Sequence, residues 1–223
     1  MIGNRSYIES GLCVSDVMSM INFHAVLDME EIDQDFSNCP IYHAVLNVGR
    51  DYFNFMSERI SPKSDRRGEV IMVIENKQHR ILMHTKSHYP SGIYRLPTGG
   101  VRFGETANTT FVRELWEETG FKAEESRGIA LLLYEFYFAE NSKPFVSYIY
   151  YQPNVSEEPV VRDPAENISD FLWSSPARIR DIAQQLMSVP DGWRDWGNMR
   201  AVSHGLVAEW LNLNRRSIRS GGT

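Results

Sequence analysis

The residues of this chain that could do chemistry are concentrated between positions 99 and 121, where acidic side chains recur at short intervals. Projected as a helix at about 100° per residue, Glu114, Glu117 and Glu118 fall within a sector of about 100°. Like charges on one helix face repel each other by a few tenths of a kcal/mol per pair, so a cation must compensate them. Arg113 is the basic side chain at hand, but a hard divalent ion with oxygen ligands fits three clustered carboxylates better.

A charge run of this kind is by itself more typical of a solvated helix face, so the wider spacing has to decide between the two interpretations. The segment follows the pattern G-x5-E-x7-R-E-U-x-E-E-x-G-U, where U is a bulky apolar residue. The pattern positions are filled by Gly99, Glu105, Arg113, Glu114, Leu115, Glu117, Glu118, Gly120 and Phe121. Seven fixed letters at roughly 6% usage each match by chance on the order of once in a hundred million starting positions. Coincidence is therefore excluded.

This arrangement resembles the Nudix box, with every motif position filled, and the chain is similar to Nudix hydrolases. The resemblance is strong over the 23 residues of the box and looser over residues 68–187. It implies an α/β/α sandwich around a mixed sheet. It also implies hydrolysis of a phosphoanhydride in a nucleoside diphosphate linked to another group, such as a nucleoside triphosphate, ADP-ribose, a nucleotide sugar or a dinucleoside polyphosphate. One local departure is Thr98, where many members carry glycine.

The resemblance further implies roles for the acidic residues and for Arg113. Glu114, Glu117 and Glu118 would bind Mg²⁺ or Mn²⁺, with Glu114 or a metal-bound water as the proton acceptor. Arg113 would orient Glu114 through a charge-assisted hydrogen bond. Glu105 would hold Arg113 or reach the metal. The expected catalytic residues are therefore Glu105, Arg113 and Glu114.

Substrate binding is expected just before the box and at its start. Gly99 and Gly100 permit a tight turn and let the backbone approach a ligand closely. Of the cations before the box, Arg95 is the best placed to neutralise a phosphate; the others are Arg80, His84, Lys86 and His88. A further general base outside the box could come from any of five glutamates, among which the sequence does not choose: Glu135, Glu140, Glu157, Glu158 and Glu166.

Periodicity and composition predict the elements that must position these residues. A helix is expected from about Thr106 to Thr119, ending at Gly120, with Val112 and Leu115 facing the core between Phe111 and Trp116. Strands are expected at residues 69–75, 80–85, 129–138, 145–151 and 170–174, the first two joined by a turn. A helix follows at residues 176–187, and a C-terminal helix is indicated by an apolar stripe: Met199, Val202, Leu206, Trp210 and Leu213.

The first 60 residues have helical spacing in two stretches, one from Ser15 to Ala25 and one over residues 41–60. We therefore expect an α/β (α+β) protein in three parts: a helical extension and linker at 1–65, a hydrolase domain at 66–190, and a C-terminal helix and tail at 191–223. An apolar stripe in the extension favours a homodimer. It contains Val48, Tyr52, Phe55 and Met56.

Composition limits the remaining classes. The chain has 223 residues, 42% of them hydrophobic and 23% charged, values that exclude a disordered or fibrous protein. No apolar run approaches the roughly 18 residues of a membrane helix, and the first residues lack a secretory layout, so we expect a cytoplasmic protein. Cys13 and Cys39 are too few for a disulfide scaffold.

The net charge of −6 leaves no basic footprint for nucleic acid, which makes a nucleotide-derived small molecule the expected partner. A metal and local basic groups would let this acidic chain bind a polyanion. The alternative is a nucleotide-sensing regulator on the same scaffold. The basic tail at Arg215, Arg216 and Arg219 favours that alternative mildly, while the intact set of glutamates argues against it.

Overall fold

The computed structural model describes residues 7–12, 23, 26–61 and 63–220. Its strands are β1 (Tyr7–Leu12), β2 (Ile41–Asn47), β3 (Gly68–Asn76), β4 (Ile81–Lys86), β5 (Thr98–Val101), β6 (Arg127–Phe138), β7 (Asn141–Val155) and β8 (Ile168–Ser174). Its helices are α2 (Met29–Asp35), α3 (Arg50–Arg59), α4 (Ala107–Thr119), α5 (Ile179–Met187) and α6 (Arg194–Ser220). Short 3₁₀ turns span Pro164–Glu166, Pro176–Arg178 and Asp191–Trp193.

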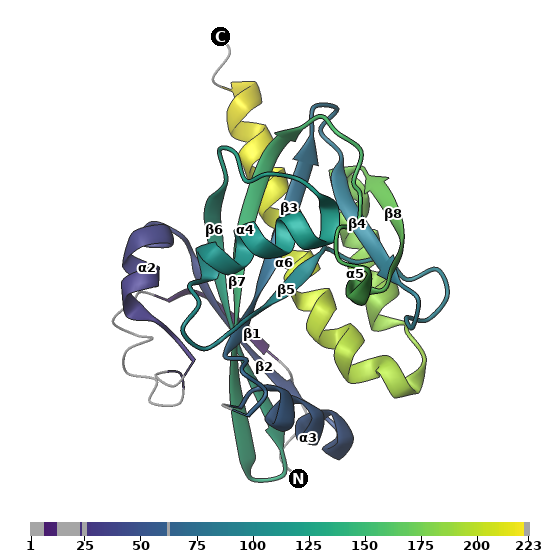
Figure 1. The fold of residues 1–223 in the computed structure, drawn as a ribbon. Helices are drawn as coiled ribbons and strands as arrows, with labels where there is room; N and C mark the ends of the chain where they lie inside the picture. Colours follow the sequence, from purple (N-terminus) through teal and green to yellow (C-terminus); the bar gives the residue numbers. More distant parts are fainter. Residues whose placement is uncertain (1–6, 13–22, 24–25, 62, 221–223) are drawn as a thin grey trace.

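The strands form one mixed sheet in the order β1-β2-β6-β7-β3-β4-β8, and β5 pairs with β3 beside this path (Figure 1). The β2–β6 and β3–β7 pairs are parallel, whereas the other pairs are antiparallel. The apolar run of β3 is buried along its length, as is usual for a strand covered on both faces. This strand is the element on which the functional residues are assembled.

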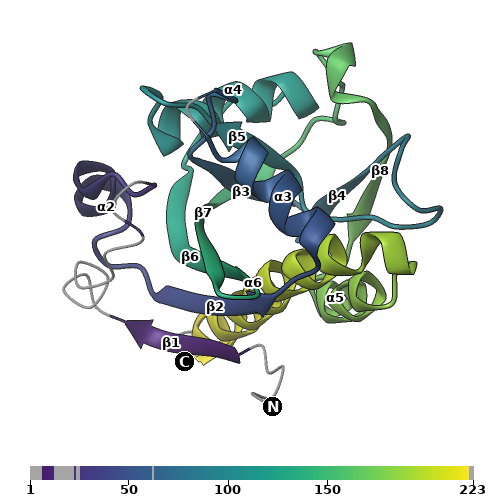
Figure 2. The same ribbon diagram turned by 90° about the horizontal axis from the view of Figure 1, so that it is seen from below.

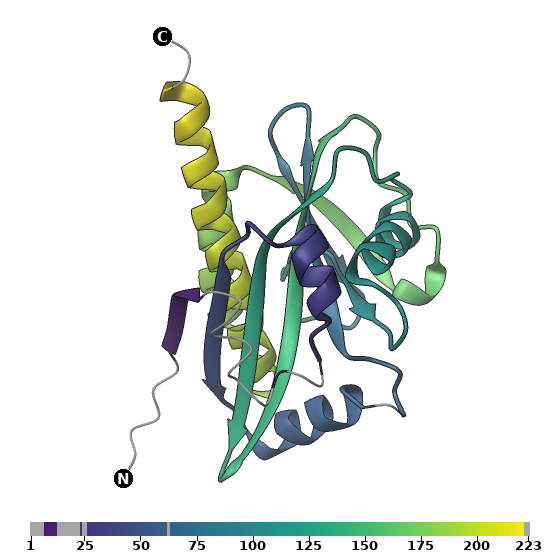
Figure 3. The same cartoon turned by 90° about the vertical axis from the view of Figure 1, so that its left-hand side faces the viewer.

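Helices cover both faces of the sheet, with α6 on one side and α2 and α4 on the other (Figure 3). Successive residues of a strand point to opposite faces, and β7 shows this directly. Tyr150 stacks on Phe111 of α4 with ring centroids 4.8 Å apart, while Tyr151 contacts Trp210 of α6 at 4.9 Å. The expected α/β/α sandwich with a C-terminal helix is confirmed.

The helix expected over residues 41–60 is wrong in its first half. Ile41–Asn47 is strand β2, which lies between β1 and β6, and α3 begins only at Arg50. The apolar spacing there also fits a helix, but the run is a mostly buried strand that pairs in parallel with β6, about 90 residues later. Of the helix expected from Ser15 to Ala25, residues 15–22 and 24–25 lie outside the described residues.

Helix α4 has the predicted bounds. Thr106 Oγ1 accepts a hydrogen bond from the Thr109 amide at 3.0 Å, and Gly120 ends the helix in the left-handed region at φ 73°. The side expected to face the core is partly wrong, because Val112 and Trp116 are 45% and 44% exposed. The buried stripe instead combines Ala107, Phe111 and Leu115 with the acidic residues Glu114 and Glu118. The helix therefore carries carboxylates into the core.

The remaining strand predictions are confirmed in β3, β4, β6, β7 and β8, and the helix predicted at 176–187 is α5 after a 3₁₀ turn. Within the described part of the chain, no helix is both long and apolar enough to cross a bilayer. Cys39 is a free, half-buried thiol, and Cys13 lies outside the described residues.

Candidate active site

The start of the site is a contact between a strand and a helix. Gly99 and Gly100, expected in a tight turn, lie instead in strand β5, paired with Val70 and Glu69 of β3. A Cβ atom at Gly99 would lie 1.9 Å from Cγ of Glu114, so a side chain there would displace the helix residue. The glycine is needed because α4 packs directly on the strand backbone, and not because the chain turns. This close packing places Glu114 at the edge of the sheet.

Arg113 organises the acidic residues around it. Its Nε and Nη2 atoms donate to the two carboxylate oxygens of Glu105 at 2.8 and 2.9 Å. Its Nη1 atom donates to Glu114 at 2.7 Å and to Glu117 at 2.9 Å, and Nη2 also reaches the Gly100 carbonyl at 3.2 Å. The hydrogen bonds from Arg113 lower the pKa of Glu105 to about 2. Glu105 therefore stays ionised and holds the arginine in place.

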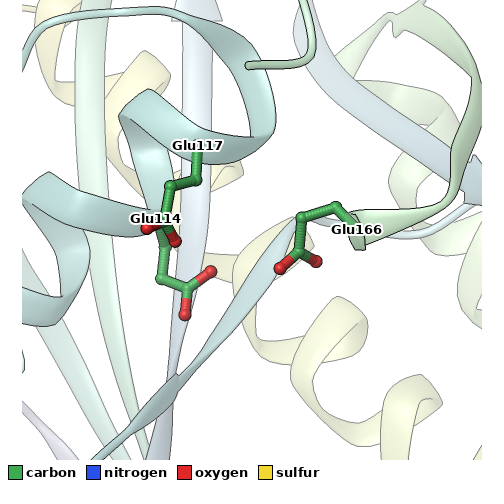
Figure 4. Close-up of side chains that lie close together, drawn as sticks. All are labelled: Glu114, Glu117 and Glu166. Carbon is green, nitrogen blue, oxygen red and sulfur yellow. The ribbon is translucent and has the colours of Figure 1, made fainter. Parts of the chain in front are cut away.

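Three carboxylates converge beside this network. One oxygen atom from each of Glu114, Glu117 and Glu166 lies within 4.8 Å of the others, and the side chains point toward a common space (Figure 4). Glu166 comes from the Pro164–Glu166 turn, which Asp163 caps through the Ala165 amide at 2.9 Å. The sequence offered Glu166 as one of five candidate bases, and the tertiary structure brings it to the carboxylates of α4.

Glu118 lies next to this group but is fully buried. Its carboxylate is 3.2 Å from Lys86 Nζ, and the same ammonium group contacts Glu166 at 2.6 Å. His84 Nδ1 is 3.8 Å from Glu118, and burial lowers the pKa of this histidine well below its usual value. Burial also raises the pKa of Glu118 to about 8, so its ionised form requires a nearby cation. Glu118 is thus joined to the three carboxylates through Lys86.

The balance of charge shows what this arrangement can bind. Five carboxylates surround two cationic side chains, Arg113 and Lys86, which leaves the cluster with an excess of acidic groups; the carboxylates belong to Glu105, Glu114, Glu117, Glu118 and Glu166. Burial raises the pKa of Glu114, and Arg113 opposes that rise. Carboxylate oxygens held this close are the ligand set of a hard divalent cation. The residues present therefore fit Mg²⁺ or Mn²⁺.

A cavity of about 610 Å³ opens beside the carboxylates. Its lining includes all three residues expected to bind substrate: Arg95, Gly99 and Gly100. Arg95 is almost completely buried, and its guanidinium donates to Tyr89 Oη, to the Leu96 carbonyl and to Thr98 Oγ1. Because most of its N–H groups are used internally, Arg95 stiffens the cavity wall. Strand β5 pairs only with β3 in the described sheet, so its other edge borders the cavity.

Two segments distant in sequence close the cavity on its other sides. Helix α3 and the start of α6 lie next to each other (Figure 2), and the Gly49 amide donates to Asp195 Oδ2 at 2.8 Å. An aromatic cluster forms part of this wall, with Trp193 and Trp196 rings 5.2 Å apart and Tyr89 5.0 Å from Trp196. These aromatic residues could not be found from the sequence, because no local pattern links Tyr89 to Trp193 and Trp196 about 100 residues later.

Helix α6 also supports the loop that leads into β5. The Leu96 amide donates to His204 Nε2 at 2.9 Å, and His204 Nδ1 donates to the Arg200 carbonyl at 2.7 Å. Burial lowers the pKa of His204 to about 3, which keeps the ring neutral and able to accept the Leu96 hydrogen bond.

Comparison with known proteins identifies the part of the chain that contains the acidic residues of the site. A family model of the NUDIX domain matches residues 65–192. A curated relative, the NAD-capped RNA hydrolase NudC of Photobacterium profundum, is 27% identical over 149 residues, which cover 66% of this chain and 53% of the relative. The chain thus spans about half the length of that relative.

Solved structures also match. A MutT NUDIX hydrolase from Burkholderia pseudomallei is 25% identical, covers 50% of this chain and 83% of its own, and has a TM-score of 0.40. An Ap4A hydrolase from C. elegans is 16% identical, covers 67% of this chain and 98% of its own, and has a TM-score of 0.41.

Proposed function

Because the chain belongs to the Nudix family, we propose that it is a metal-dependent hydrolase of a phosphoanhydride bond in a nucleoside diphosphate linked to another group. The observation that carries the proposal is the group of three carboxylates, Glu114, Glu117 and Glu166, at the mouth of a cavity large enough for a nucleotide. A pyrophosphate resists water because its negative charge repels the nucleophile, so catalysis needs charge neutralisation and positioning.

Glu114, Glu117 and Glu166 would hold Mg²⁺ or Mn²⁺, and Glu118, which is buried beside them in contact with Lys86, stays a predicted ligand. Such an ion would neutralise negative charge on the substrate phosphates and help to activate a water molecule for attack. Arg113 keeps Glu114 and Glu117 oriented, while Glu105 holds Arg113. Lys86, placed between Glu118 and Glu166, supplies positive charge beside the substrate phosphates.

The open edge of β5 gives the substrate a backbone surface. Gly99 and Gly100 have no side chains of their own, and Glu114 and Arg66 fill the space where their Cβ atoms would lie, so a phosphate at this edge would meet the strand backbone together with these two side chains. Arg95 would not contact the substrate directly; its hydrogen bonds would hold Thr98 and Tyr89 of the cavity wall in position. These contacts orient the scissile group toward the carboxylates.

The test is a panel of nucleoside triphosphates, ADP-ribose, nucleotide sugars, dinucleoside polyphosphates and NAD, assayed with Mg²⁺, with Mn²⁺ and with EDTA. The NudC relative is the reason to include NAD. We expect metal-dependent release of a nucleoside monophosphate from at least one compound, and a decrease of kcat by about 10³-fold in Glu114→Gln. Glu124→Gln, which changes an exposed glutamate outside the cavity, is the matched control.

Absence of cleavage by the folded protein would contradict the proposal. A sensing role on the same scaffold predicts nucleotide binding without turnover, so calorimetric titration of the same compounds separates the two functions. The expected homodimer is tested in parallel by light scattering, since it stays a prediction.

A further inference from the structure

Beyond the acidic cluster, the cavity is lined by arginines from four separate segments. Arg59 ends α3, Arg66 precedes β3, Arg95 precedes β5 and Arg200 lies in α6. The chain as a whole has a net charge of −6, so such a concentration of positive charge within one cavity runs against its composition. The internal partners of each arginine show which of them are available to a ligand.

Two of the four arginines have protein partners. Arg200 donates from Nη1 and Nη2 to the two carboxylate oxygens of Glu69, at 2.6 and 3.0 Å. Glu69 also accepts from Ser147 Oγ at 2.9 Å, so its carboxylate is held by three hydrogen bonds. Arg95 donates to Tyr89, Leu96 and Thr98. These two side chains are structural parts of the wall.

The guanidinium groups of Arg59 and Arg66 make no hydrogen bond and no ion pair within the described part of the chain. Arg59 lies over the ring of Phe55, with its Cζ atom 5.6 Å from the ring centroid. Arg66 lies over Gly100, since a Cβ atom there would be 2.2 Å from Nη2. Gly100 thus leaves space for a guanidinium, just as Gly99 leaves space for Glu114.

The surroundings of these two groups raise the electrostatic cost of keeping them charged. Burial, followed by the charge of Arg59, lowers the pKa of Arg66 to about 10, and Arg59 lies at the exposed rim of the cavity, where partial desolvation lowers its pKa as well. Glu69, the carboxylate in this part of the cavity, is already neutralised by Arg200. Glu69 and Glu114 favour the charged form of Arg66 from a distance, yet neither arginine is paired with a carboxylate, and two unpaired guanidinium groups lining one cavity are suited to bind an anion.

We propose that Arg59 and Arg66 form a second anion-binding subsite, which binds a phosphoryl group that the substrate carries in addition to its scissile pyrophosphate. The planar guanidinium fork matches phosphate oxygens in pairs. This inference rests on the proposed hydrolase function and narrows its substrate class. The preferred substrate is a nucleotide derivative with a further phosphoryl group, on the ribose or along the phosphate chain.

The subsite is held in place before any ligand arrives. The Gly49 amide at the start of α3 donates to Asp195 of α6, and Tyr52 Oη donates to Met199 Sδ at 3.1 Å. These contacts fix the helix that ends in Arg59 against the helix that carries Arg200. A ligand therefore meets a wall whose two helices are already fixed relative to each other, so that only side chains have to be ordered on binding.

Binding without catalysis tests the subsite directly. The full chain is titrated in EDTA with AMP, with adenosine 2′,5′- and 3′,5′-bisphosphate, and with ATP, which is not hydrolysed when metal is absent. We expect the wild type to bind at least one of the more phosphorylated probes about tenfold more tightly than AMP. Arg59→Met combined with Arg66→Met should remove this preference and change AMP binding by less than about twofold.

Two further variants separate charge from shape and from general effects. Arg66→Lys keeps the charge but loses the fork, so it should retain part of the preference. Arg180→Met changes an exposed arginine of α5 outside the cavity and should retain all of it. Thermal unfolding confirms that each variant is folded.

An equal loss of affinity for AMP and for the more phosphorylated probes would overturn the proposal, as would a wild type that binds all probes alike. The KM values for hydrolysis of NADP and NAD, which differ by one phosphoryl group, test the preference independently of the titrations; the subsite predicts a lower KM for NADP. If the wild type cleaves nothing, the hydrolase function fails while the titrations still decide the subsite. If Glu114→Gln abolishes cleavage and the arginine variants leave the preference intact, the subsite alone fails.

Discussion

The two sides of the cavity are built in different ways. The acidic side comes almost entirely from one contiguous stretch, residues 98–119, to which the 164–166 turn adds Glu166. The basic side combines α3, Arg66 and α6, which are far apart in the sequence. The chemistry of the reaction thus depends on local spacing, whereas the wall that would select the substrate depends on long-range packing.

This contrast predicts different consequences of substitution. Changes on the acidic side should lower kcat, because they alter groups that act on the reacting phosphates. Changes in α3 and α6 should alter stability or KM, because these helices hold the wall and the loop before β5. Three substitutions test the contrast, beginning with the largest effect.

Glu166→Gln removes one carboxylate charge from the group of three while keeping its size. We expect kcat to fall about 100-fold and the affinity for Mn²⁺, measured by electron paramagnetic resonance, to fall with it. Glu140→Gln, an exposed glutamate at the β6–β7 turn, is the control and should behave like the wild type. A variant that binds Mn²⁺ normally and changes only KM would remove Glu166 from the metal site and weaken the contrast.

His204→Gln tests the support that α6 gives to the loop before β5. The folded-state pKa of about 3 lies below the ordinary value of 6.5, so between these values the unfolded chain binds a proton that the folded chain does not. The contribution of neutral His204 to the free energy of unfolding is therefore fully present above about pH 6.5 and is lost as the pH falls toward 3. Between pH 7 and 5 the wild type should lose roughly 2 kcal/mol more than the variant.

Urea unfolding at both pH values measures this difference. Glutamine has no ionisable group at position 204, so its pH dependence should be flatter by that amount. Equal slopes for the two proteins would show that His204 is not the buried neutral acceptor of the Leu96 amide.

Asp195→Ala has the smallest expected effect, because it removes one hydrogen bond between α6 and the start of α3. The free energy of unfolding should fall by about 1 kcal/mol, comparable to the loss of a helix cap. KM for the best substrate should rise roughly threefold while kcat stays unchanged, because the wall becomes less ordered. Glu209→Ala, at an exposed position of α6, is the control. A lower kcat with unchanged KM would contradict the assignment of α6 to the substrate wall.

Much of the fold could be predicted from local patterns. The apolar run of β3, the aromatic strands β6 and β7, and helix α4 with its cap at Gly120 all lie where periodicity and composition placed them. Strand β2 could not be predicted this way, because its identity depends on parallel pairing with β6. The break at Asn47 and Gly49 was the available local signal that the run did not continue as one helix.

Glycine shows how the same residue can be interpreted in two ways. Gly99 and Gly100 predicted a turn because glycine tolerates tight backbone conformations. In the structure they lie in β5, where the missing Cβ atoms make room for Glu114 and Arg66. The sequence showed that glycine stands at these two positions, but it did not show that the side chains of Glu114 and Arg66 exclude any larger residue there.

By itself, the sequence determined the family and the acidic residues of α4, because a helix converts spacing along the chain into a shared face. It did not determine which glutamate would join them. Glu166 reaches the group, and Glu118 is buried against Lys86, because the 164–166 turn and β4 meet α4 only after the sheet has formed. Arg59 and Arg66 likewise share one cavity only in the folded chain. Contacts between distant segments are set by packing, which no local spacing encodes.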